Sequence, residues 1–374
     1  MVRKTNEKIG LLRYVLFCAS VVAITILCIS HSGCQITSEG IKVLDAAESP
    51  EITSVKTLDE KSLEVCFNKA VKAKTATVSK LGSSERASLD KTAHDAMEAR
   101  ALVSNDRKTV VYEFASETKV GERYQLFGEI ADSRGNSLTF ALPFDGYNSR
   151  IPILVIEEVQ GAYSNTGNVH RCEYIILTAL TAGNLGGLEL YSAQYSNILS
   201  NYQFPSCEVK AGEKIMFHLR TFADVDFKNE TGENLAEDKG ESSKSYIRDL
   251  FFENNKKCLN ENYGVILLRN KSNMKILDAV LYTTESEKGK FLSLSRSAEL
   301  AISQGKWNSN SQEDFAPRIL EKGRLTPTSR CLRRKDINEL LERAKNGKIT
   351  QDEICGSKDS WDADVLTLYN SSRK

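Results

Sequence analysis

Apolar and polar residues alternate along several short segments in the first half of this chain. The alternation starts after Glu51 and is clearest at Leu63, Val65 and Phe67, which have polar or charged residues between them. Strict alternation is typical of a strand with one buried face and one solvated face. Further segments of this kind lie at 75–81, 100–104, 109–114, 123–130 and 137–144. Strands at this spacing, with no long helical period among them, predict a small antiparallel β-sandwich over residues 51–147.

The second half of the chain contains continuous apolar runs instead. Ile151–Val159 and Tyr174–Leu180 are rich in β-branched residues and flank a polar turn, and Leu188–Ser192 follows a corner rich in glycine. Short apolar runs bounded by turn residues predict strands rather than helices. Later runs at 214–219, 264–268 and 276–282 continue the pattern. We therefore expect a second β-sandwich domain over residues 150–374.

Two segments of this second domain lack the strand pattern. Residues 221–260 form a long charged insertion, and residues 332–356 form an insertion with a helical pattern. In the latter we expect a helix over Asp336–Asn346, capped by Asp336 and with Leu340 and Leu341 on its apolar side. The predicted fold class is all-β, with two β-sandwich domains in tandem and a short C-terminal helix.

Residues 1–34 have the organisation of a signal peptide or membrane anchor. Basic residues at positions 3, 4, 8 and 13 precede an uncharged apolar run, Tyr14–Ser30, and small residues then lead to Cys34. This order describes an export signal. Ser32-Gly33-Cys34 resembles the lipobox of bacterial lipoproteins, which implies lipid attachment at Cys34. Because the run is also close to the length of a spanning helix, an uncleaved helical anchor is the alternative.

Under either alternative the part of the chain after residue 34 is exported, to the periplasmic or the cell-surface side of a bacterial envelope. Residues 35–50 are small and polar and are expected to form a linker. Lysine plus arginine and aspartate plus glutamate both number 50 in the 374 residues, so the formal net charge is zero. A general nucleic-acid binder needs a basic excess, and no nucleic-acid partner is expected.

Nine cysteines are consistent with an exported chain. Cys18 and Cys28 lie in the apolar run, and Cys34 is the candidate for lipid attachment. The other six lie in a compartment that permits disulfides and allow 15 pairings, which sequence does not separate. They are Cys66, Cys172, Cys207, Cys258, Cys331 and Cys355. We expect one or two disulfides among them, with the remaining thiols buried as small apolar side chains.

Residues 51–145 resemble the bacterial Ig-like domain of surface proteins. The segment SVKTLDEKSLEVCFNKAV matches the opening of that family, and GERYQLFGEIADSRGNSL matches its closing segment through Tyr124, Asp132, Gly135 and Asn136. The resemblance implies an Ig-like β-sandwich. Gly135-Asn136 is also, from its residue types alone, suited to the positive φ of a tight turn.

The second domain resembles the lamin-tail Ig-like domain in its bacterial extracytoplasmic form. Five matches occur in the family's order: IEEV at 156–159, EYIIL at 173–177, NLGGL at 184–188, an aromatic-Phe-Pro step followed by a Gly-Glu turn at 202–213, and LDAV at 277–280. The sequence LTALTAGNLGGLELYSA resembles that of treponemal members in particular. The resemblance implies that Ile175 and Leu177 face the core, with Tyr174 nearer the surface. We expect the Glu173 carboxylate to be exposed.

Candidate chemistry is sparse. Asp224, Asp226 and Glu230 lie in the charged insertion and offer oxygen ligands for calcium, but their spacing differs from an EF-hand loop and a solvated loop is favoured. The histidines are far apart in sequence, and His218 is expected to pack on a strand, partly exposed. The basic run Arg330–Lys335 is expected to be solvated or to touch an anionic surface. No cofactor is expected.

These patterns together predict a protein that is not an enzyme. We expect a membrane-attached exported protein with a structural, adhesion or partner-binding role in the cell envelope, its partner being an unidentified protein. Two alternatives stay open. One is an accessory subunit for a separate exported hydrolase, since lamin-tail-like domains are often appended to extracellular nucleases and phosphatases. The other is a calcium-dependent adhesin, which requires the acidic residues of the insertion to bind metal.

Overall fold

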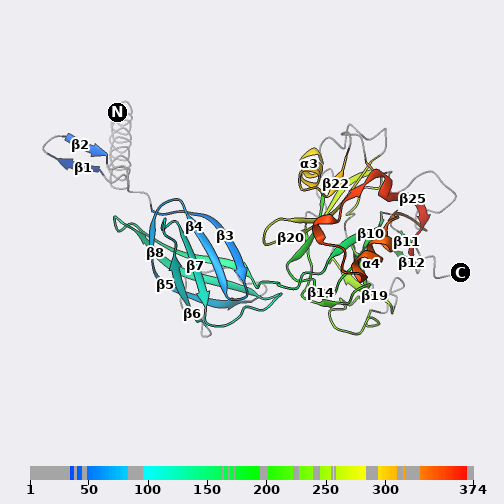
Figure 1. Ribbon diagram of the computed structural model, residues 1–374, viewed down its shortest axis with the longest axis horizontal. Coiled ribbons are helices and arrows are strands. Elements are labelled where there is room, and N and C mark those ends of the chain that lie inside the picture. The colour runs from blue at the N-terminus through cyan, green and yellow to red at the C-terminus, as the bar shows by residue number, and fades with distance from the viewer. Residues whose placement is uncertain are drawn as a thin grey trace, which may run out of the picture. The chain divides into compact units, whose positions relative to one another are not determined.

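The chain is dominated by β-strands and forms two compact units (Figure 1). Unit 1 comprises residues 1–56, 61–116 and 125–143, and unit 2 comprises residues 57–60, 117–124 and 144–374. The computed structural model describes residues 34–37, 40–43, 49–82, 96–161, 164–166, 169–171, 173–193, 201–221, 227–238, 245–253, 256, 258–283, 294–309, 315–316 and 329–368. The predicted all-β class with a short C-terminal helix is confirmed.

Unit 1 contains a seven-stranded sheet in the order β3-β4-β7-β6-β5-β8-β9. Its strands are β3 (Ile52–Asp59), β4 (Ser62–Phe67), β5 (Val71–Leu81), β6 (Met97–Val103), β7 (Thr109–Phe114), β8 (Arg123–Asp132) and β9 (Ser137–Asp145). The Phe140 ring of β9 lies 6.2 Å from that of Phe67 in β4 and 6.3 Å from that of Tyr112 in β7. Because β9 is not a hydrogen-bonded neighbour of either strand, the sheet curls over and encloses an aromatic core.

Alternation in unit 1 places apolar side chains inside and polar ones outside. Leu63, Val65 and Phe67 of β4 are buried, as predicted, and the residues between Leu63 and Phe67 are half-buried. The turn after β8 is built by Asp132, whose Oδ1 accepts N–H groups of Arg134 and Asn136, both at 2.9 Å. Gly135 has φ +89°, so the predicted tight turn is confirmed. Strand β1 (Cys34–Thr37) begins at the last residue of the predicted signal or anchor segment and pairs antiparallel with β2 (Gly40–Val43) of the predicted linker.

Unit 2 is built from two facing sheets. The larger has the order β19-β18-β13-β10-β23-β25 and the smaller the order β16-β15-β20-β21. The larger sheet consists of β10 (Leu154–Gln160), β13 (Tyr174–Ala179), β18 (Lys214–His218), β19 (Ile247–Phe251), β23 (Arg330–Arg334) and β25 (Trp361–Leu366). The smaller consists of β15 (Leu188–Ala193), β16 (Tyr202–Gln203), β20 (Tyr263–Asn270) and β21 (Ile276–Thr283). Strand β19 comes from the predicted charged insertion and pairs parallel with β18, so that insertion extends the sheet.

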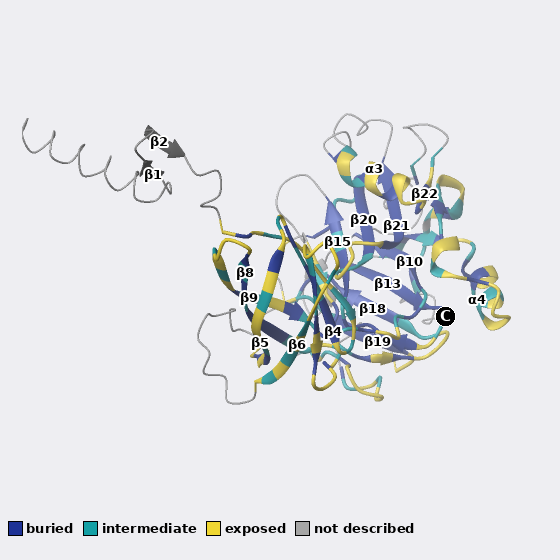
Figure 2. Cartoon of the chain, turned by 60° about the vertical axis from the view of Figure 1, so that its left-hand side comes forward, coloured by how far each residue is buried: buried dark blue, intermediate teal, exposed yellow. Residues whose placement is uncertain are grey.

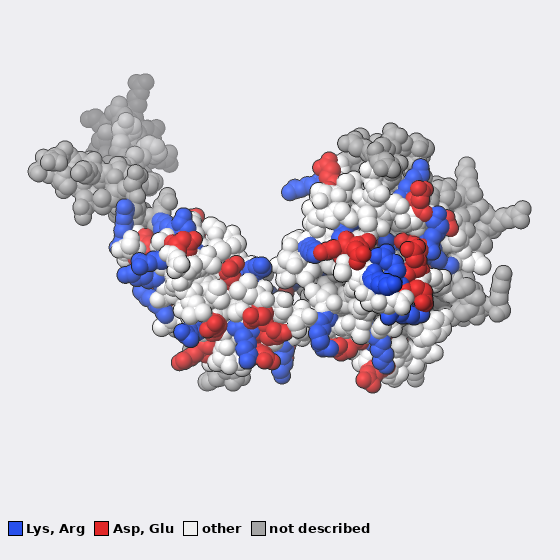
Figure 3. Space-filling view, viewed as in Figure 1, with Lys and Arg blue, Asp and Glu red and all other residues white. Residues whose placement is uncertain are grey.

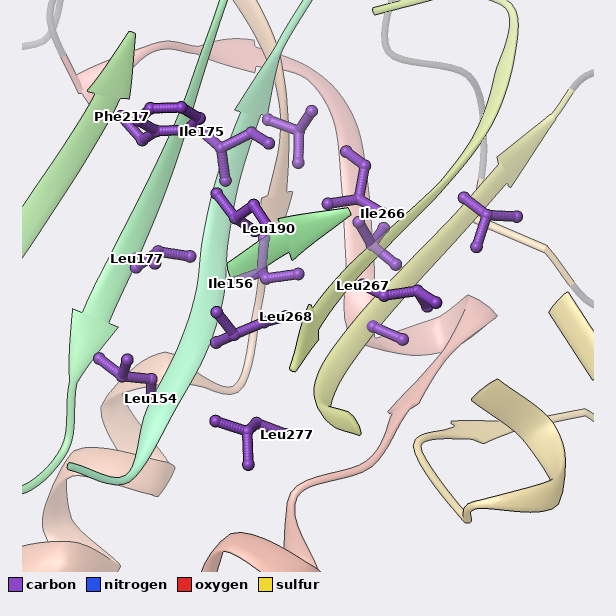
Figure 4. Packing of buried hydrophobic residues seen from close by; sticks show 14 of the residues in the cluster. Leu154, Ile156, Ile175, Leu177, Leu190, Phe217, Ile266, Leu267, Leu268 and Leu277 are labelled. Carbon is purple, nitrogen blue, oxygen red and sulfur yellow. The ribbon is translucent and has the colours of Figure 1, made fainter. Parts of the chain in front are cut away.

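The core of unit 2 lies between these sheets. Ile156 and Ile175 of the larger sheet meet Leu190 and Leu268 of the smaller one (Figure 4). Ile175 and Leu177 are both fully buried in this core, as predicted. Short paired strands complete the unit: β11 (Ser164–Thr166), β12 (Val169–Arg171), β14 (Gly183–Asn184), β17 (Glu208–Val209), β22 (Trp307–Asn308) and β24 (Gly356–Ser357).

Helices cover only small parts of unit 2. Helix α4 (Ile337–Lys345) is flanked by Asp336 and Asn346, which confirms the predicted helix. The predicted cap is wrong in one respect, because Asp336 makes no side-chain capping bond and its Oδ1 instead accepts Arg334 Nε at 2.8 Å. Helix α3 (Ser295–Ser303) was not predicted, and two 3₁₀ turns, η4 (Gln351–Glu353) and η5 (Lys358–Ser360), follow α4.

The described cysteines do not form the expected disulfides with one another. Cys66, Cys207, Cys331 and Cys355 are free thiols, and the Cys258 thiol donates to the Leu219 carbonyl at 3.0 Å. The expectation that thiols serve as small buried side chains fits Cys207 and Cys331. Cys18, Cys28 and Cys172 lie outside the described residues. In the part of the chain that the structure describes, no helix is both long and apolar enough to cross a membrane, and the run 14–30 lies outside that part.

Candidate functional site

Charged side chains are buried on the face of the larger sheet that points away from the core. On this outer face Val155 packs against Ile337 and Leu340, so α4 covers one part of it. Tyr174 and Ile176 belong to another buried cluster on the same face. In Figure 2 the strands β10, β13 and β18 are dark blue along most of their length. The prediction that Tyr174 lies near the surface is therefore wrong, because both faces of this sheet are covered.

The outer face receives two adjacent glutamates from β10. The pairing of β10 with β13 shifts between Ile156 and Glu158, so Glu157 is the extra residue of a bulge. The Glu157 carboxylate accepts hydrogen bonds from the Thr178 hydroxyl and from Lys214 Nζ. Because the bulge interrupts the alternation, Glu157 and Glu158 both find partners on the outer face rather than on opposite faces.

Glu158 is fully buried and joins four separate segments. Its carboxylate accepts the Tyr174 hydroxyl at 2.6 Å, the Arg333 Nη2 at 2.7 Å and the Leu368 backbone N–H at 3.1 Å. Burial raises the pKa of Glu158, against the opposing effect of the Arg333 guanidinium. These contacts attach β13, β23 and the segment after β25 to the bulge in β10.

A second buried pair connects the two sheets. Asp278 of β21 and Arg334 of β23 lie 2.7 Å apart, and the same carboxylate oxygen accepts the Ile156 N–H at 2.7 Å. Both side chains are fully buried, and burial raises the pKa of Asp278 against the effect of Arg334. The guanidinium also lies 5.8 Å from the Trp361 ring centre. This pair therefore ties β21 to β10 and β23 across the sandwich.

Two further acid–base pairs lie towards β18 and β19. Glu173 is fully buried and pairs with Arg220 at 2.8 Å, so the expectation that Glu173 is exposed is wrong. His218 Nε2 lies 2.6 Å from Asp249 Oδ1, and the ring stacks on Phe251 at 4.3 Å. His218 is only 1% exposed, which corrects the expected partial exposure. A strand carrying a charge inside the protein needs such a partner, because an unpaired buried charge is costly.

The chemistry of these pairs is mainly that of crosslinks between strands. A histidine held by a carboxylate is the orienting half of a catalytic triad, but His218 and Asp249 are both buried. The pair is therefore placed to hold β18 and β19 together rather than to meet a substrate from solvent. Arg333 and Arg334 likewise enter the sheet, so the expectation of a solvated basic run is wrong for these two residues.

The residues predicted to bind calcium or to carry a lipid do not belong to these buried ion pairs. Both carboxylate oxygens of Glu230 accept backbone N–H groups, Oε1 from Glu237 at 3.0 Å and Oε2 from Asp249 at 2.8 Å. Asp224 and Asp226 lie outside the described residues. Across the described ranges, no group of three or more potential ligand residues could hold a metal ion. Cys34 is the first residue of β1, opposite Val43.

The sequence contained a signal for the buried pairs that its interpretation missed. Glu157, Glu158 and Asp278 stand inside apolar strand runs, where a charge needs a partner of opposite sign. The arginines that pair with Glu158 and Asp278 lie next to each other at 333 and 334, more than 50 residues beyond Asp278, whereas Glu157 pairs with Lys214. Pairing Glu158 with Arg333 would have predicted that β23 lies in the same sheet as β10, and pairing Asp278 with Arg334 would have predicted the link between the two sheets.

Two comparisons of sequence found similar proteins. The family model described as "TP_1001_2nd: protein second domain" matches residues 152–363. A protein of Treponema pallidum (strain Nichols) that carries the name "Uncharacterized protein" is 28% identical over 202 residues, or 52% of this chain and 50% of that protein. The chain thus spans about half the length of this curated relative.

Solved structures are similar at a lower level. The N-terminal part of the bacterial S-layer protein SbsC has a TM-score of 0.24 and 17% identity, covering 42% of this chain and 38% of that chain. A DUF4876 family protein from Bacteroides thetaiotaomicron VPI-5482 has a TM-score of 0.31 and 13% identity, covering 80% of this chain and 93% of that chain. These scores are too low to support a conclusion about function.

Proposed function

We propose, from the premise that this chain belongs to the TP_1001 second-domain family, that it is an exported protein attached to a membrane. Its two β-rich units then serve a non-catalytic role in the cell envelope, in structure, adhesion or the binding of a partner protein. The observation that carries this proposal is the order of residues at the N-terminus: basic positions, the uncharged run Tyr14–Ser30 and then Ser32-Gly33-Cys34.

Crosslinked buried charges in unit 2 support a rigid scaffold for such a role. Glu158 alone joins four segments, and the Asp278–Arg334 pair joins the two sheets. Groups held in this way keep the sheet in one arrangement, because each charge inside the protein needs its particular partner. A rigid sandwich displays its loops and edges in fixed positions, as proteins that bind other proteins commonly do.

We further propose that unit 2 has the lamin-tail variant of the Ig-like sandwich. Two of the matched motifs have identifiable structural roles. The IEEV segment forms the bulged strand β10, and the LDAV segment supplies Asp278 of β21 to the backbone of β10. The acidic residues of both motifs thus stabilise the packing of the sandwich, which is a physical reason for their presence in a non-catalytic domain.

Cell fractionation with mass spectrometry tests the attachment. The protein is expected in the membrane fraction and in the detergent phase, with an acylated cysteine at position 34 as its first residue. The matched variant Cys34→Ala should lose the acyl group and retain the uncleaved N-terminus. An N-terminus at Met1 or Val2 in the native protein would contradict lipidation at Cys34 and would support the uncleaved helical anchor. Recovery of the native protein in the aqueous phase alone would overturn membrane attachment.

Protease treatment of intact cells, followed by chemical crosslinking, tests the binding role. A structural or adhesive protein is expected to be crosslinked to envelope components at residues of the exported units. Co-purification with one exported hydrolase, together with a change in that enzyme's activity, would instead support the accessory role. Activity of the purified chain itself towards a substrate would contradict the non-catalytic proposal.

A further inference from the structure

One end of unit 1 combines three exposed turns that carry basic residues. The turns are 67–71, 104–109 and 132–136, which join β4 to β5, β6 to β7 and β8 to β9. Arg107, Lys108 and Arg134 are exposed and Lys69 is half-buried. We call these four residues the basic end. Figure 3 shows lysines and arginines gathered over the upper left of this unit, with a few acidic side chains among them.

Backbone hydrogen bonds bring the first two turns together. The Lys108 carbonyl accepts the Phe67 N–H at 2.7 Å, and the Arg107 carbonyl accepts the Val71 N–H at 2.8 Å. The third turn lies beside the first, because β5 and β8 are neighbouring strands and Lys74, near the start of β5, lies 2.6 Å from Glu129, near the end of β8. The four basic residues therefore belong to one surface rather than to separate loops.

The acidic residues at this end are held by their own turns. Asp106 Oδ1 accepts the Ser104 hydroxyl at 2.5 Å and the Lys108 N–H at 2.9 Å. Asp132 accepts N–H groups within its own turn, as described above. Glu51 Oε2 accepts the Asn68 side-chain amide at 3.3 Å. Arg107 and Lys108 are exposed beside these carboxylates, and their longer side chains extend beyond the turns into solvent.

Arg107 also has an unusual backbone conformation, with φ +56°. Glycine and asparagine are the usual residues in this left-handed region, and another residue there merits a functional explanation. An arginine at the tip of the turn places a long cationic side chain where a glycine would satisfy the backbone better. The turn therefore carries a cationic side chain at a position where the backbone favours glycine.

The basic end is also where the chain enters the unit. Asn68 N donates to the Glu51 carbonyl at 3.0 Å, so the start of β3 lies against the turn 67–71. The hairpin between β3 and β4 lies at the opposite end, where Phe114 N donates to the Lys61 carbonyl at 2.7 Å. The residues that precede Glu51 in the chain include the proposed membrane attachment. The basic end is therefore the end of unit 1 that is connected most directly to the membrane.

We propose that the basic end binds the anionic head groups of phospholipids on the membrane to which the chain is attached. The proposal rests on the membrane attachment proposed above. Guanidinium and ammonium groups bind phosphate oxygens through charge-assisted hydrogen bonds, and anionic lipid surfaces attract clusters of such residues. Binding holds unit 1 against the head groups and orients it relative to the membrane. The apolar anchor supplies attachment, and the basic end supplies orientation.

Hydrogen exchange of the full chain in lipid nanodiscs tests the proposal. Nanodiscs of phosphatidylcholine alone are compared with nanodiscs that also contain phosphatidylglycerol. Amides of the three turns should exchange more slowly in the anionic nanodiscs, and added salt should remove the difference. Each basic residue at an anionic surface contributes about fivefold to binding. The variant Arg107→Glu/Lys108→Glu should therefore abolish the protection.

The matched control reverses two exposed lysines at the opposite end of the unit. Lys61→Glu/Lys80→Glu makes the same change in net charge and should leave the protection of the three turns intact. Equal exchange in the two kinds of nanodisc, with the chain still anchored, would overturn the proposal and leave the attachment standing. Equal protection by soluble polyglutamate would also overturn it and assign the surface to an acidic protein.

If the chain does not stay in nanodiscs, the attachment itself is wrong. Sedimentation with phosphatidylglycerol vesicles then tests separately whether the basic end binds anionic lipid. Binding that the Arg107→Glu/Lys108→Glu variant loses and the Lys61→Glu/Lys80→Glu variant keeps would support the lipid surface. Absence of binding by the native chain would overturn it.

Discussion

Unit 1 and the larger sheet of unit 2 bury their strands in different ways. In unit 1 the aromatic side chains of Phe67, Tyr112 and Phe140 fill a one-sided core, and Asp132, at the end of β8, is the one buried charged residue among those described there. In unit 2 the strand β13 is buried on both faces, and charged residues such as Glu158 lie inside. The first arrangement depends on apolar burial, and the second also depends on matched charges.

This difference predicts different responses to mutation. An apolar core loses stability in proportion to the atoms removed and the cavity left behind. A buried ion pair loses most when one partner is removed, because the other charge is then left in a medium of low dielectric constant. Replacing both partners by apolar residues is far less harmful than replacing one. The two units can be followed separately, since both tryptophans, Trp307 and Trp361, are buried in unit 2.

The largest effect is expected for Arg334→Met. This change leaves the fully buried Asp278 carboxylate without its guanidinium, and breaking such a pair costs about 3–5 kcal/mol. Urea unfolding followed by tryptophan fluorescence should show the loss in the free energy of unfolding of unit 2. Exchange of the unit 1 core amides should not change.

The double variant Arg334→Met/Asp278→Leu is the control for that effect. It removes both charges and should recover a large part of the lost free energy. A loss in the double variant equal to the sum of the two single losses would mean that the charges are not coupled. The contrast between the units would then have no electrostatic basis.

The next effect compares the two faces of β13. Ile175 faces the main core and Ile176 faces the outer cluster, and both are fully buried. Truncation of either residue to alanine should lower the free energy of unfolding by about 2–5 kcal/mol. The exposed Val55 of unit 1 is the control. Val55→Ala should change the free energy of unfolding of unit 1 by less than about 0.5 kcal/mol. A small effect of Ile176→Ala together with a large effect of Ile175→Ala would mean that only the Ile175 face of β13 is buried, as the sequence predicted.

The sequence predicted the strands of unit 1 better than the surroundings of the strands in unit 2. Alternation at Leu63, Val65 and Phe67 reports directly on which face is buried, because only one face is covered. A run such as Tyr174–Leu180 contains no alternation, so its apolar pattern identifies a strand without showing that both faces are buried. Helix α4 was predictable because its apolar residues and flanking polar residues are local.

The ion pairs were not predictable in the same way because their partners are distant in sequence. Glu158 and Arg333 are separated by 175 residues, and the Glu157 bulge depends on pairing between strands. The parallel strand β19 arises in a charged insertion, where only Leu250 and its neighbours indicate a strand. A charge inside an apolar run indicates that a partner is needed, but tertiary context decides which distant residue supplies it and where the bulge lies.

A smaller effect is expected where backbones and rings come close in unit 1. A Cβ on Gly128 of β8 would lie 2.4 Å from the Phe140 ring, which also contacts Phe67 and Tyr112. Gly128→Ala should therefore cost about 1–3 kcal/mol through overpacking. The measurement is hydrogen exchange of unit 1, with the tryptophan transition of unit 2 unchanged. Adding Phe140→Leu should make room for the new methyl group and recover part of the lost stability of unit 1. No recovery in that double variant would mean that the contact with the Phe140 ring is not the cause of the loss.

The smallest expected effect is an opposite dependence of the two units on pH. The Asn136 amide and the N–H groups of its turn lower the pKa of Asp132 below its ordinary value of 3.8. Burial raises the pKa of Glu158 above its ordinary value of 4.5. Folded Asp132 holds its proton less tightly than the unfolded chain does, so its contribution is lost as the pH falls below 3.8. Folded Glu158 holds its proton more tightly, so its contribution is lost as the pH rises above 4.5.

Hydrogen exchange of unit 1 and tryptophan fluorescence of unit 2, measured from acid to neutral pH, should show these slopes with opposite signs. Asp132→Asn should flatten the acid limb of unit 1 only, because asparagine does not titrate. Glu158→Gln should flatten the slope of unit 2 above pH 4.5 only, although it also lowers stability by leaving Arg333 without a charged partner. A slope of the same sign in both units, unaffected by either variant, would show that neither carboxylate distinguishes them.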